Sequence, residues 1–380
     1  MNYRLIGKYM GHILLVEGIF LLPAIAVSAA YREPQSARAI AIAAIITLLP
    51  GILLSCIRSH RSISMSEGFV VCALGWVVLS LFGALPFYIS GEIPRYIDCW
   101  FETVSGFTTT GSSILTEVEN KSHGLLYWRS FTHWIGGMGV LVFLLAILPL
   151  AKGDGEPFNL MKAESPGPSV GKLAPKISTT AKITYIIYFV MTVVMIAVLL
   201  FEGMPLFDAV LNSFGTAGTG GFAIKNNSIA AYPSQLVQMT IAVFMALFGV
   251  NFSVYYLMLS KKWKDAFLNE EFRWYWGIML GASLLIAGNV FLKGFYPSDF
   301  GQAFRDSFFS VSSVMTTTGF CTADFDKWPE FSRYMLLLVM CIGASAGSTG
   351  GGMKVSRVLL LCKHLRIQMC QMIHPRRVRS

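Results

Sequence analysis

The sequence predicts an all-α polytopic membrane protein, in which helix–pore-loop–helix repeats (three present) follow two N-terminal transmembrane helices. Of its 380 residues, 54% are hydrophobic and only 13% are charged, whereas a soluble domain carries about 25% charged residues. The phrase Thr-Thr-Thr-Gly occurs twice, at 108–111 and 316–319, and a looser copy, Thr-Gly-Gly-Phe, occupies 219–222. Each copy follows a short apolar segment and lies between two segments long enough to cross a bilayer.

The long segments are read from their apolar content, because a membrane span needs about 20 such residues. The candidates are 11–30, 39–57, 68–90, 125–150, 183–202, 234–259, 274–295 and 333–366, the last one interrupted. The predicted organisation is 1–62 for the two N-terminal helices, 63–152 for repeat 1, 153–182 for a cytosolic linker, 183–262 for repeat 2, 263–366 for repeat 3 with a broken last helix, and 367–380 for a basic cytosolic tail.

Three shorter segments are amphipathic and span about three helical turns, too few to cross a membrane. They lie at 97–107, 206–217 and 303–315. We expect them to be re-entrant half-helices. They carry Glu102, Asp208 and Asp306 near the predicted external mouth. These acids either concentrate cations there or act as capping and solvated residues, and both alternatives stay open.

The placement of positive charge predicts the orientation. With the N-terminus inside, 20 of the 30 Lys and Arg residues fall on the cytosolic side, as the positive-inside rule requires. Both termini are then cytosolic, and the Thr/Gly turns open from the external side. The net charge of +9 lies between apolar spans, so topology explains it better than nucleic-acid binding does. The seven cysteines are scattered singly, which disfavours a metal site or a disulfide framework.

The Thr/Gly turns suit cation coordination. An ion in a pore exchanges water for oxygen ligands, and successive backbone carbonyls supply them where the chain adopts unusual dihedral angles. Glycine reaches positive φ freely, and threonine stiffens the turn through its branched side chain. The C-terminal end of each half-helix adds partial negative charge. A lone copy would be read as a helix-ending turn, but three copies in one context favour a selectivity filter.

A glycine-rich stretch at 343–352 interrupts the last span. Its five glycines, among small polar residues, cannot hold a stable helix. An unwound segment at membrane depth persists only against protein or water. One alternative is close helix packing through small residues. Another, a phosphate-binding loop, fails because Met353 stands before Lys354 where that motif needs glycine.

Several further motifs carry a family resemblance. They are Ser-Glu-Gly-Phe at 66–69, Gly-Ala-Leu-Pro-Phe at 83–87, Trp-Ile-Gly-Gly-Met-Gly at 134–139, Ala-Glu-Ser-Pro-Gly-Pro at 163–168 and Ala-Gly-Ser-Thr-Gly-Gly-Gly-Met-Lys at 346–354. With the Thr/Gly turns, they make nearly the whole chain resemble the Trk/Ktr/HKT superfamily of potassium transporters, most closely its TrkH type.

The resemblance implies a potassium uptake protein and not an enzyme, with K⁺ as the transported ion, no cofactor and no nucleic acid. It implies K⁺ filter residues at Thr108, Thr109, Thr110, Gly111, Thr219, Gly220, Gly221, Phe222, Thr316, Thr317, Thr318 and Gly319. It implies a gate loop at Gly347, Ser348, Thr349, Gly350, Gly351 and Gly352. It also implies a homodimer in the bacterial inner membrane, with a cytosolic dinucleotide-binding regulatory subunit as partner.

The family pattern has a fourth repeat that this sequence does not show. A fragment, a repeat supplied by a separate chain and a three-repeat variant are the open explanations. A truncated, non-conducting pore subunit is therefore an alternative function. A secondary permease for an organic solute is another, although the small residues of 343–352 offer no solute pocket. Among single residues, we expect Arg129 to reach lipid headgroups and His133 to be a packing residue with a satisfied ring. Lys354 either marks the cytosolic end of its span, which we favour, or faces the internal vestibule.

Overall fold

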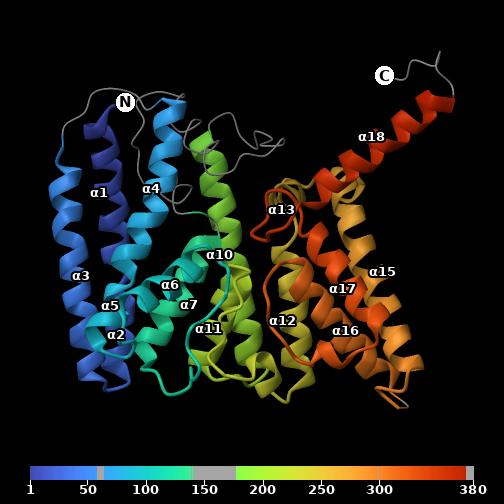
Figure 1. The fold of residues 1–380 in the computed structure, drawn as a ribbon, viewed down its shortest axis with the longest axis horizontal. Coiled ribbons are helices and arrows are strands. Elements are labelled where there is room, and N and C mark those ends of the chain that lie inside the picture. The colour runs from blue at the N-terminus through green and yellow to red at the C-terminus, as the bar shows by residue number, and fades with distance from the viewer. Residues whose placement is uncertain (58–63, 138, 140–176, 298, 374–380) are drawn as a thin grey trace.

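The computed structural model describes residues 1–57, 64–137, 139, 177–297 and 299–373, and every regular element within these ranges is a helix. Helix α1 begins and helix α18 ends at the same end of the molecule (Figure 1). Two large apolar cores hold the described helices together, one around the N-terminal helices and the first repeat, the other around the second and third repeats, and a small third cluster includes Leu126 and Leu211.

The N-terminal helices are α1 (Tyr3–Phe20), α2 (Leu22–Ala30) and α3 (Pro34–Ser55), and α1 packs along α3. The Ser-Glu-Gly-Phe motif explains how the next helix, α4 (Met65–Gly83), begins. Ser64 and Glu67 form a reciprocal capping box there, which satisfies N–H groups that have no partner inside the helix. Glu67 also accepts the backbone N–H of Asn2 at 2.8 Å, so the cap ties the start of the chain to the first repeat.

The rest of the chain repeats one pattern, in which an outer helix, a half-helix and an inner helix follow in turn. The outer helices are α4 with α5 (Leu85–Ser90), α10 (Ile177–Phe201) and α15 (Glu270–Leu292). The half-helices are α6 (Tyr96–Phe107), α11 (Leu206–Ala217) and α16 (Phe300–Met315). The inner helices are α7 (His123–Gly137), α12 (Gln235–Phe248) with α13 (Phe252–Leu259), and α17 (Glu330–Ile342) with α18 (Val355–Ile373). Short helices α14 (Trp263–Leu268), η1 (Ser228–Ala231) and η2 (Phe325–Lys327) lie in connections.

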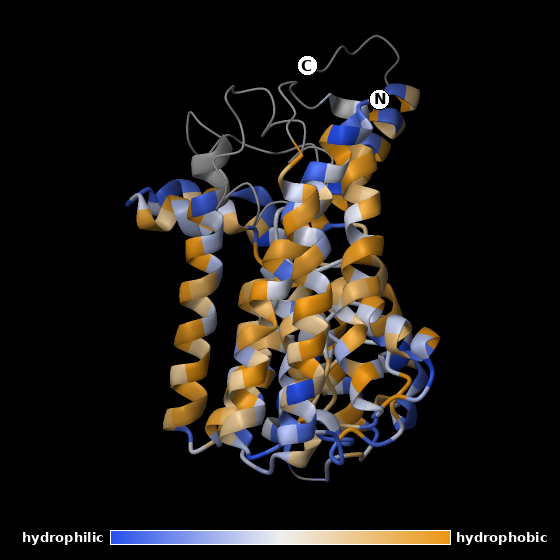
Figure 2. Ribbon diagram, turned by 90° about the vertical axis from the view of Figure 1, so that its left-hand side faces the viewer, coloured by the Kyte–Doolittle hydropathy of each residue, from blue (hydrophilic) through white to orange (hydrophobic). Residues whose placement is uncertain are grey.

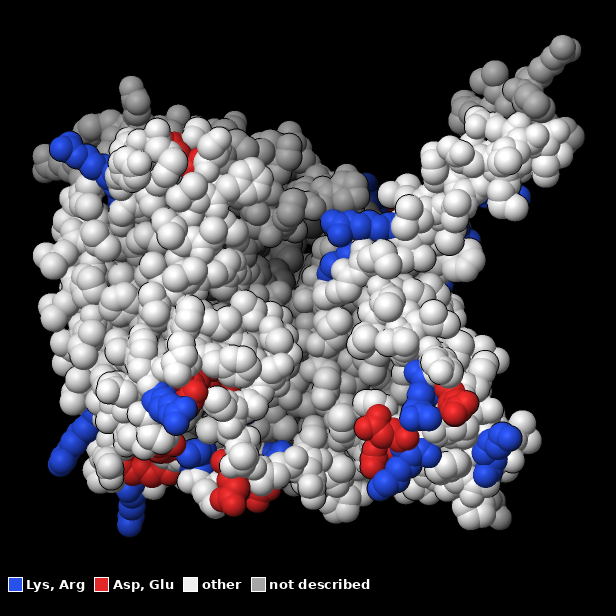
Figure 3. All heavy atoms as spheres, in the orientation of Figure 1, with Lys and Arg blue, Asp and Glu red and all other residues white. Residues whose placement is uncertain are grey.

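Helix length separates spanning elements from half-helices. Within the described residues, five helical segments are long and apolar enough to cross a membrane, and a sixth qualifies if the bent pair α12–α13 counts as one span. At 1.5 Å per residue, α15 is roughly 34 Å long and α6 only about 18 Å, against a hydrocarbon core of about 30 Å. The long helices are largely apolar (Figure 2). On the face shown in Figure 3, charged side chains gather along the lower edge and leave a broad uncharged band above it.

The three half-helices lie where the sequence predicts them, but the span predicted at 234–259 is not continuous. Its two parts, α12 and α13, meet at an angle of 91°. A Cβ on Gly249 would lie 2.3 Å from the Tyr275 hydroxyl, and the Asn251 side chain caps α13 by accepting the N–H of Ser253 at 2.9 Å. The close approach at Gly249 and the new helix start at Asn251 therefore interrupt the helix that was expected to be continuous.

Three other sequence predictions fall partly outside the described residues. The predicted span 125–150 is described as far as Gly137 and at Gly139, and the linker 153–182 only from Ile177, where α10 begins. In the tail at 367–380, residues up to Ile373 belong to α18.

The inner helices link neighbouring repeats. Helix α7 packs against its own half-helix α6 and against α11 of the next repeat. Helix α12 likewise packs against α11 and against α16 of the next repeat, and α17 packs against α16. This order brings the C-terminal ends of the three half-helices, and the turns that follow them, next to one another.

Candidate functional site

The three Thr/Gly turns share one backbone conformation. In each turn the second residue and the fourth residue have positive φ: Thr109 (53°) and Gly111 (76°), Thr219 (50°) and Gly221 (78°), Thr317 (58°) and Gly319 (85°). The N–H of the third residue bonds to the carbonyl five residues earlier, from Thr110 to Ser105, Gly220 to Gly215 and Thr318 to Ser313. This is a Schellman-type helix end, built the same way three times.

This register adds a residue that the sequence reasoning missed. The first position has similar backbone angles in all three turns and is filled by Thr108 (φ −80°, ψ 1°), Gly218 (φ −74°, ψ −8°) and Thr316 (φ −86°, ψ 0°). The second turn is therefore 218–221, and Phe222 is the residue that follows it, as Phe320 follows the third turn. Counting back from the shared glycines Gly111, Gly221 and Gly319 gives Gly218 from the sequence alone.

The second position of each turn is strained. A Schellman turn normally has glycine there, because left-handed backbone is unfavourable for a β-branched side chain. Each of Thr109, Thr219 and Thr317 therefore costs on the order of 1–3 kcal/mol. Such strain persists only where the surroundings hold it, and it gathers at functional sites. The same strained threonine in three separate segments marks these turns as the candidate site.

A pair of contacting threonine hydroxyls occurs in the first and third turns but not in the second. The hydroxyls of Thr108 and Thr110 lie 2.8 Å apart, and those of Thr316 and Thr318 lie 2.7 Å apart. The equivalent positions of the second turn are Gly218 and Gly220, which have no side chain. The second turn therefore lacks this pair, and its own side-chain bond is that of the Thr219 hydroxyl to the Gly218 carbonyl at 2.7 Å.

The turns lie side by side in the order of the chain. A Cβ on Gly111 would lie 2.0 Å from the carbonyl oxygen of Gly220, and one on Gly221 would lie 1.9 Å from that of Thr318. The glycines of the first and second turns therefore face the third residue of the following turn. A Cβ on Gly319 would meet no atom within 4 Å in the described part of the chain.

The third positions of the turns carry backbone carbonyls that have no hydrogen-bond donor in the described part of the chain. Among the described residues, the carbonyl oxygens of Thr110, Gly220 and Thr318 accept no hydrogen bond. In the described part of the chain, no group of three or more His, Cys, Asp or Glu side chains is placed to hold a metal ion. Any cation at this site would therefore meet backbone carbonyl and threonine oxygens, at the partially negative ends of the half-helices.

The motif at 134–139 explains how α7 holds two turns. A Cβ on Gly136 would lie 2.1 Å from the Phe107 carbonyl oxygen, and one on Gly137 would lie 2.5 Å from Cα of Gly218. His133 is fully buried and stacks on the Phe222 ring, with centroids 4.0 Å apart. Its Nδ1 accepts the Phe222 N–H at 3.3 Å. His133 therefore packs against the exit of the second turn and hydrogen-bonds to it, while its buried Nε2 has no hydrogen-bond partner among the described residues.

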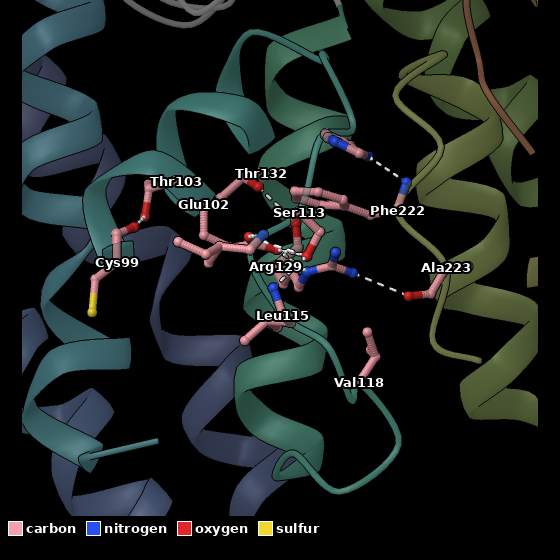
Figure 4. A network of polar contacts seen from close by, with 12 residues as sticks. Cys99, Glu102, Thr103, Ser113, Leu115, Val118, Arg129, Thr132, Phe222 and Ala223 are labelled. Carbon is pink, nitrogen blue, oxygen red and sulfur yellow. Dashed lines mark hydrogen bonds and ion pairs between the residues drawn. The ribbon is translucent and has the colours of Figure 1, made fainter. Parts of the chain in front are cut away.

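Arg129 does not reach the headgroups, so that sequence prediction is wrong. Its side chain is 3% exposed and pairs with the fully buried Glu102 carboxylate at 2.6 Å. Arg129 also donates to the Ala223 carbonyl at 3.0 Å and lies over the Phe222 ring at 3.5 Å (Figure 4). The Glu102 carboxylate, the Ala223 carbonyl and the Phe222 ring together stabilise the charge of Arg129 away from water. The amphipathic pattern of α7 could not reveal these partners.

The acids of the half-helices have different surroundings. Glu102 is neither a solvated mouth residue nor a cap, because Arg129, Ser113 and the Ile114 N–H bond to it. Asp208 lies in the first turn of α11 and accepts the Tyr232 hydroxyl at 2.8 Å. Asp306 is 7% exposed.

The glycine-rich loop at 343–354 contacts the third turn. The N–H of Gly351 donates to the Thr317 hydroxyl at 2.8 Å. A Cβ on Gly350 would lie 3.0 Å from the Thr316 carbonyl oxygen. The Nζ of Lys354 bonds back to the Gly350 carbonyl, so Lys354 closes the loop and does not simply mark the end of a span.

The other side of the loop rests on the α12–α13 bend and on α15. The Phe252 N–H donates to the Gly347 carbonyl, and the Ser345 N–H donates to the Gly249 carbonyl, both at 3.0 Å. The Glu271 carboxylate, in the first turn of α15, accepts the Ala346 N–H at 2.7 Å. The loop is therefore hydrogen-bonded to the third turn on one side and to these two elements on the other.

Comparison with known proteins agrees with this architecture. The family model for TrkH, described as a cation transport protein, matches residues 35–274 and 284–380. A Trk system potassium uptake protein TrkH from Salmonella typhimurium is 35% identical, over 100% of this chain and 79% of that protein. A Halomonas elongata protein of the same name is 32% identical, over 99% of this chain and 78% of its own length.

A solved structure gives the same result. The crystal structure of the potassium transporter TrkH from Vibrio parahaemolyticus superposes with a TM-score of 0.86 at 30% identity, covering 100% of this chain and 78% of that one. The family consists of membrane transporters and not enzymes. With the family model matching most of its length, this chain belongs to the TrkH family of cation transport proteins.

Proposed function

We propose that this chain takes up potassium ions across the bacterial inner membrane, with the three Thr/Gly turns as its selectivity filter. Relatives that bear the name potassium uptake protein support the choice of ion. The observation that carries the proposal is the triplicate backbone, in which a strained threonine and a glycine of positive φ recur in three adjacent turns.

The turns would act by replacing the water around the ion. An entering K⁺ loses part of its hydration shell, and the unbonded carbonyls of Thr110, Gly220 and Thr318 take its place. The C-terminal ends of α6, α11 and α16 lower the cost of holding the positive charge. No covalent step is needed for this exchange of ligands.

The loop residues 347–352 would serve as the gate. The loop bonds to Thr317, and it contains only small side chains and backbone at this point. The loop would move as a unit once its hydrogen bonds to Glu271 and to the α12–α13 bend are released, because one short segment of the loop makes all of these bonds.

The remaining assignments extend this picture. Both termini would lie in the cytosol, as the distribution of Lys and Arg supports, and the turns would face the outside. The family resemblance supports a homodimer and a cytosolic dinucleotide-binding regulatory subunit as partners.

A second candidate function rests on the open side of the third turn. Gly111 and Gly221 are each covered by the next turn, whereas nothing within 4 Å of a Cβ on Gly319 is found among the described residues. This favours a pore component that conducts once a further pore loop, from any source, packs against Gly319.

Growth and flux together test both functions. The 380-residue chain is expressed in a bacterium lacking potassium uptake and, separately, reconstituted into liposomes for Rb⁺ flux. Growth on low K⁺ with K⁺-selective flux supports uptake by the chain itself. Flux that arises only when a fourth pore loop is fused or co-expressed supports the second candidate. No flux in either arrangement contradicts the proposal.

A further inference from the structure

We infer that the buried Glu102–Arg129 pair determines ion selectivity by fixing the separation of the first and second Thr/Gly turns. The inference rests on the proposed function and adds a pair of positioning residues to it. Neither side chain touches the ion path itself. Both act through the segments that leave the two turns.

One half of the pair holds the segment after the first turn. Glu102 lies on α6, nine residues before Gly111, and is fully buried. Its carboxylate accepts the Ser113 hydroxyl at 2.9 Å and the Ile114 N–H at 3.0 Å. The position of the chain just beyond Gly111 is therefore set by this carboxylate (Figure 4).

The other half holds the segment after the second turn. Arg129 donates from Nη1 to the Ala223 carbonyl at 3.0 Å, and its guanidinium lies 3.5 Å from the Phe222 ring centroid. Phe222 directly follows Gly221. Through its Nε bond to Glu102 at 2.6 Å, Arg129 thus joins the exits of both turns in one chain of contacts.

The second turn needs this external support more than the others. It lacks the hydroxyl pair found in the first and third turns, because Gly218 and Gly220 fill those positions. Because two of its residues have no side chain, its backbone depends on contacts made by neighbouring segments. The Arg129 guanidinium, with two hydrogen-bond partners and a ring contact, restricts movement of this backbone, since Arg presents its donors in a fixed plane.

The equivalent seam between the second and third turns carries no such pair. Nine residues before Gly221 stands Asn212, whose amide bonds to Tyr232. Gly137 and Gly249 pack against the first residues of the second and third turns, 218 and 316. The residue eight positions before Gly137 is Arg129 on α7. The residue eight positions before Gly249 is the apolar, fully buried Ile241 on α12. The charged clamp is therefore specific to the seam beside the glycine-rich second turn.

The predicted consequence is a loss of selectivity and not of conduction. Selection between K⁺ and Na⁺ depends on the arrangement and mobility of the coordinating oxygens. A second turn free to approach the first can contract around the smaller ion. Arg129→Gln and Glu102→Gln should each lower the K⁺/Na⁺ permeability ratio by roughly tenfold, which corresponds to about 1.4 kcal/mol.

The experiment uses the same pore preparation as the functional test, with ion ratios measured from Rb⁺ and Na⁺ flux in liposomes and normalised to folded protein. Arg129→Lys keeps the charge without the planar fork and should give an intermediate ratio. Glu33→Gln is the matched control, because it alters the 2.8 Å contact of the Glu33 carboxylate, just before α3, with the His123 ring at the start of α7, away from the turns, and should leave the ratio unchanged.

A lone buried charge can prevent folding, so two further variants keep the test decisive. The double variant Glu102→Gln, Arg129→Gln removes both charges together, and Phe222→Leu removes the ring face with no change of charge. Both should show the lowered ratio. Variants that conduct with the wild-type ratio overturn the inference while leaving the proposed function intact. A wild type without K⁺ flux would instead contradict the function.

Discussion

The backbone N–H of Gly351 donates a hydrogen bond to the hydroxyl of Thr317 across 2.8 Å, which joins the glycine-rich loop to the strained residue of the third turn. Thr317 also donates its own hydroxyl hydrogen to the Thr316 carbonyl at 2.6 Å. Its hydroxyl thus links the backbone of the turn to the loop. Any movement of the loop away from the turn must break this link first.

Replacement of Thr317 by Val should raise basal cation leak through the pore. The variant keeps the branched shape but leaves the Gly351 N–H without its acceptor, and an unsatisfied buried donor costs about 1–3 kcal/mol. Rb⁺ flux without any activating partner measures the leak. Thr109→Val is the matched control, because it makes the same change in a turn to which no loop residue bonds, so its flux should not rise. Equal flux in the Thr317→Val and Thr109→Val variants would show that Thr317 does not hold the loop in place.

Glu271 should hold the loop from its other side. Glu271→Ala removes the acceptor of the Ala346 N–H and should raise basal flux, whereas Glu271→Gln keeps an amide oxygen and should have a smaller effect. The neighbouring Glu270→Ala breaks a pair with Lys363 in which both side chains are about half exposed. Exposed pairs contribute only about 0–1 kcal/mol, so this control should behave as wild type. We expect basal flux, measured in single channels or liposomes, to be highest in Glu271→Ala, lower in Glu271→Gln and lowest in Glu270→Ala. A Glu270→Ala variant that leaks as strongly as Glu271→Ala would contradict this prediction.

The elements that the sequence predicted well are those with a local signature. The half-helices expected at 97–107, 206–217 and 303–315 correspond to α6, α11 and α16, because length and amphipathic period are properties of a short window. The break in the last span was visible as a dense run of glycines. The register of the second turn was also accessible from the sequence, by counting from Gly221.

The elements that were missed depend on partners far along the chain. The Arg129–Glu102 pair joins residues 27 positions apart, and the contacts of Arg129 with Ala223 join residues 94 apart. The bend at Gly249 depends on the hydroxyl of Tyr275 and on the loop residue Ser345. No periodicity within one segment records which distant group will lie against it.

Cysteine labelling should establish the orientation of the chain. Cys321 follows the third turn and Cys362 lies on α18, and both are exposed. In single-cysteine variants, a membrane-impermeant maleimide added to intact cells should label Cys321, and should label Cys362 only after permeabilisation. The reverse pattern would invert the proposed topology.

The pH dependence of the same labelling follows from the surroundings of Cys321. Desolvation of its sulfur, followed by the nearby Asp324 and Asp326, raises the pKa of the Cys321 thiol. Only the thiolate reacts, so less of the reactive form is present at neutral pH than for an ordinary thiol. The labelling rate should therefore keep rising above pH of about 8.5, where a free cysteine is half ionised. Asp324→Asn should increase the rate at neutral pH.

Serine substitution of the three turn glycines should separate backbone strain from contact between turns. All three positions have positive φ, so each substitution strains the turn. At Gly111 and Gly221 the new Cβ would also collide with the carbonyl oxygen of the next turn, at 2.0 and 1.9 Å. Gly111→Ser and Gly221→Ser should therefore abolish K⁺-selective flux.

Gly319→Ser is the informative comparison, because its Cβ meets nothing within 4 Å among the described residues. If only those residues form the pore, this variant carries the strain of about 1–3 kcal/mol without a collision, and it should keep reduced but measurable flux. If a further pore loop packs against Gly319 in the working transporter, the variant should fail as completely as the other two. Flux of Rb⁺ and Na⁺ through the three variants, each normalised to folded protein, distinguishes these outcomes. Wild-type flux and selectivity in all three would refute the filter assignment itself.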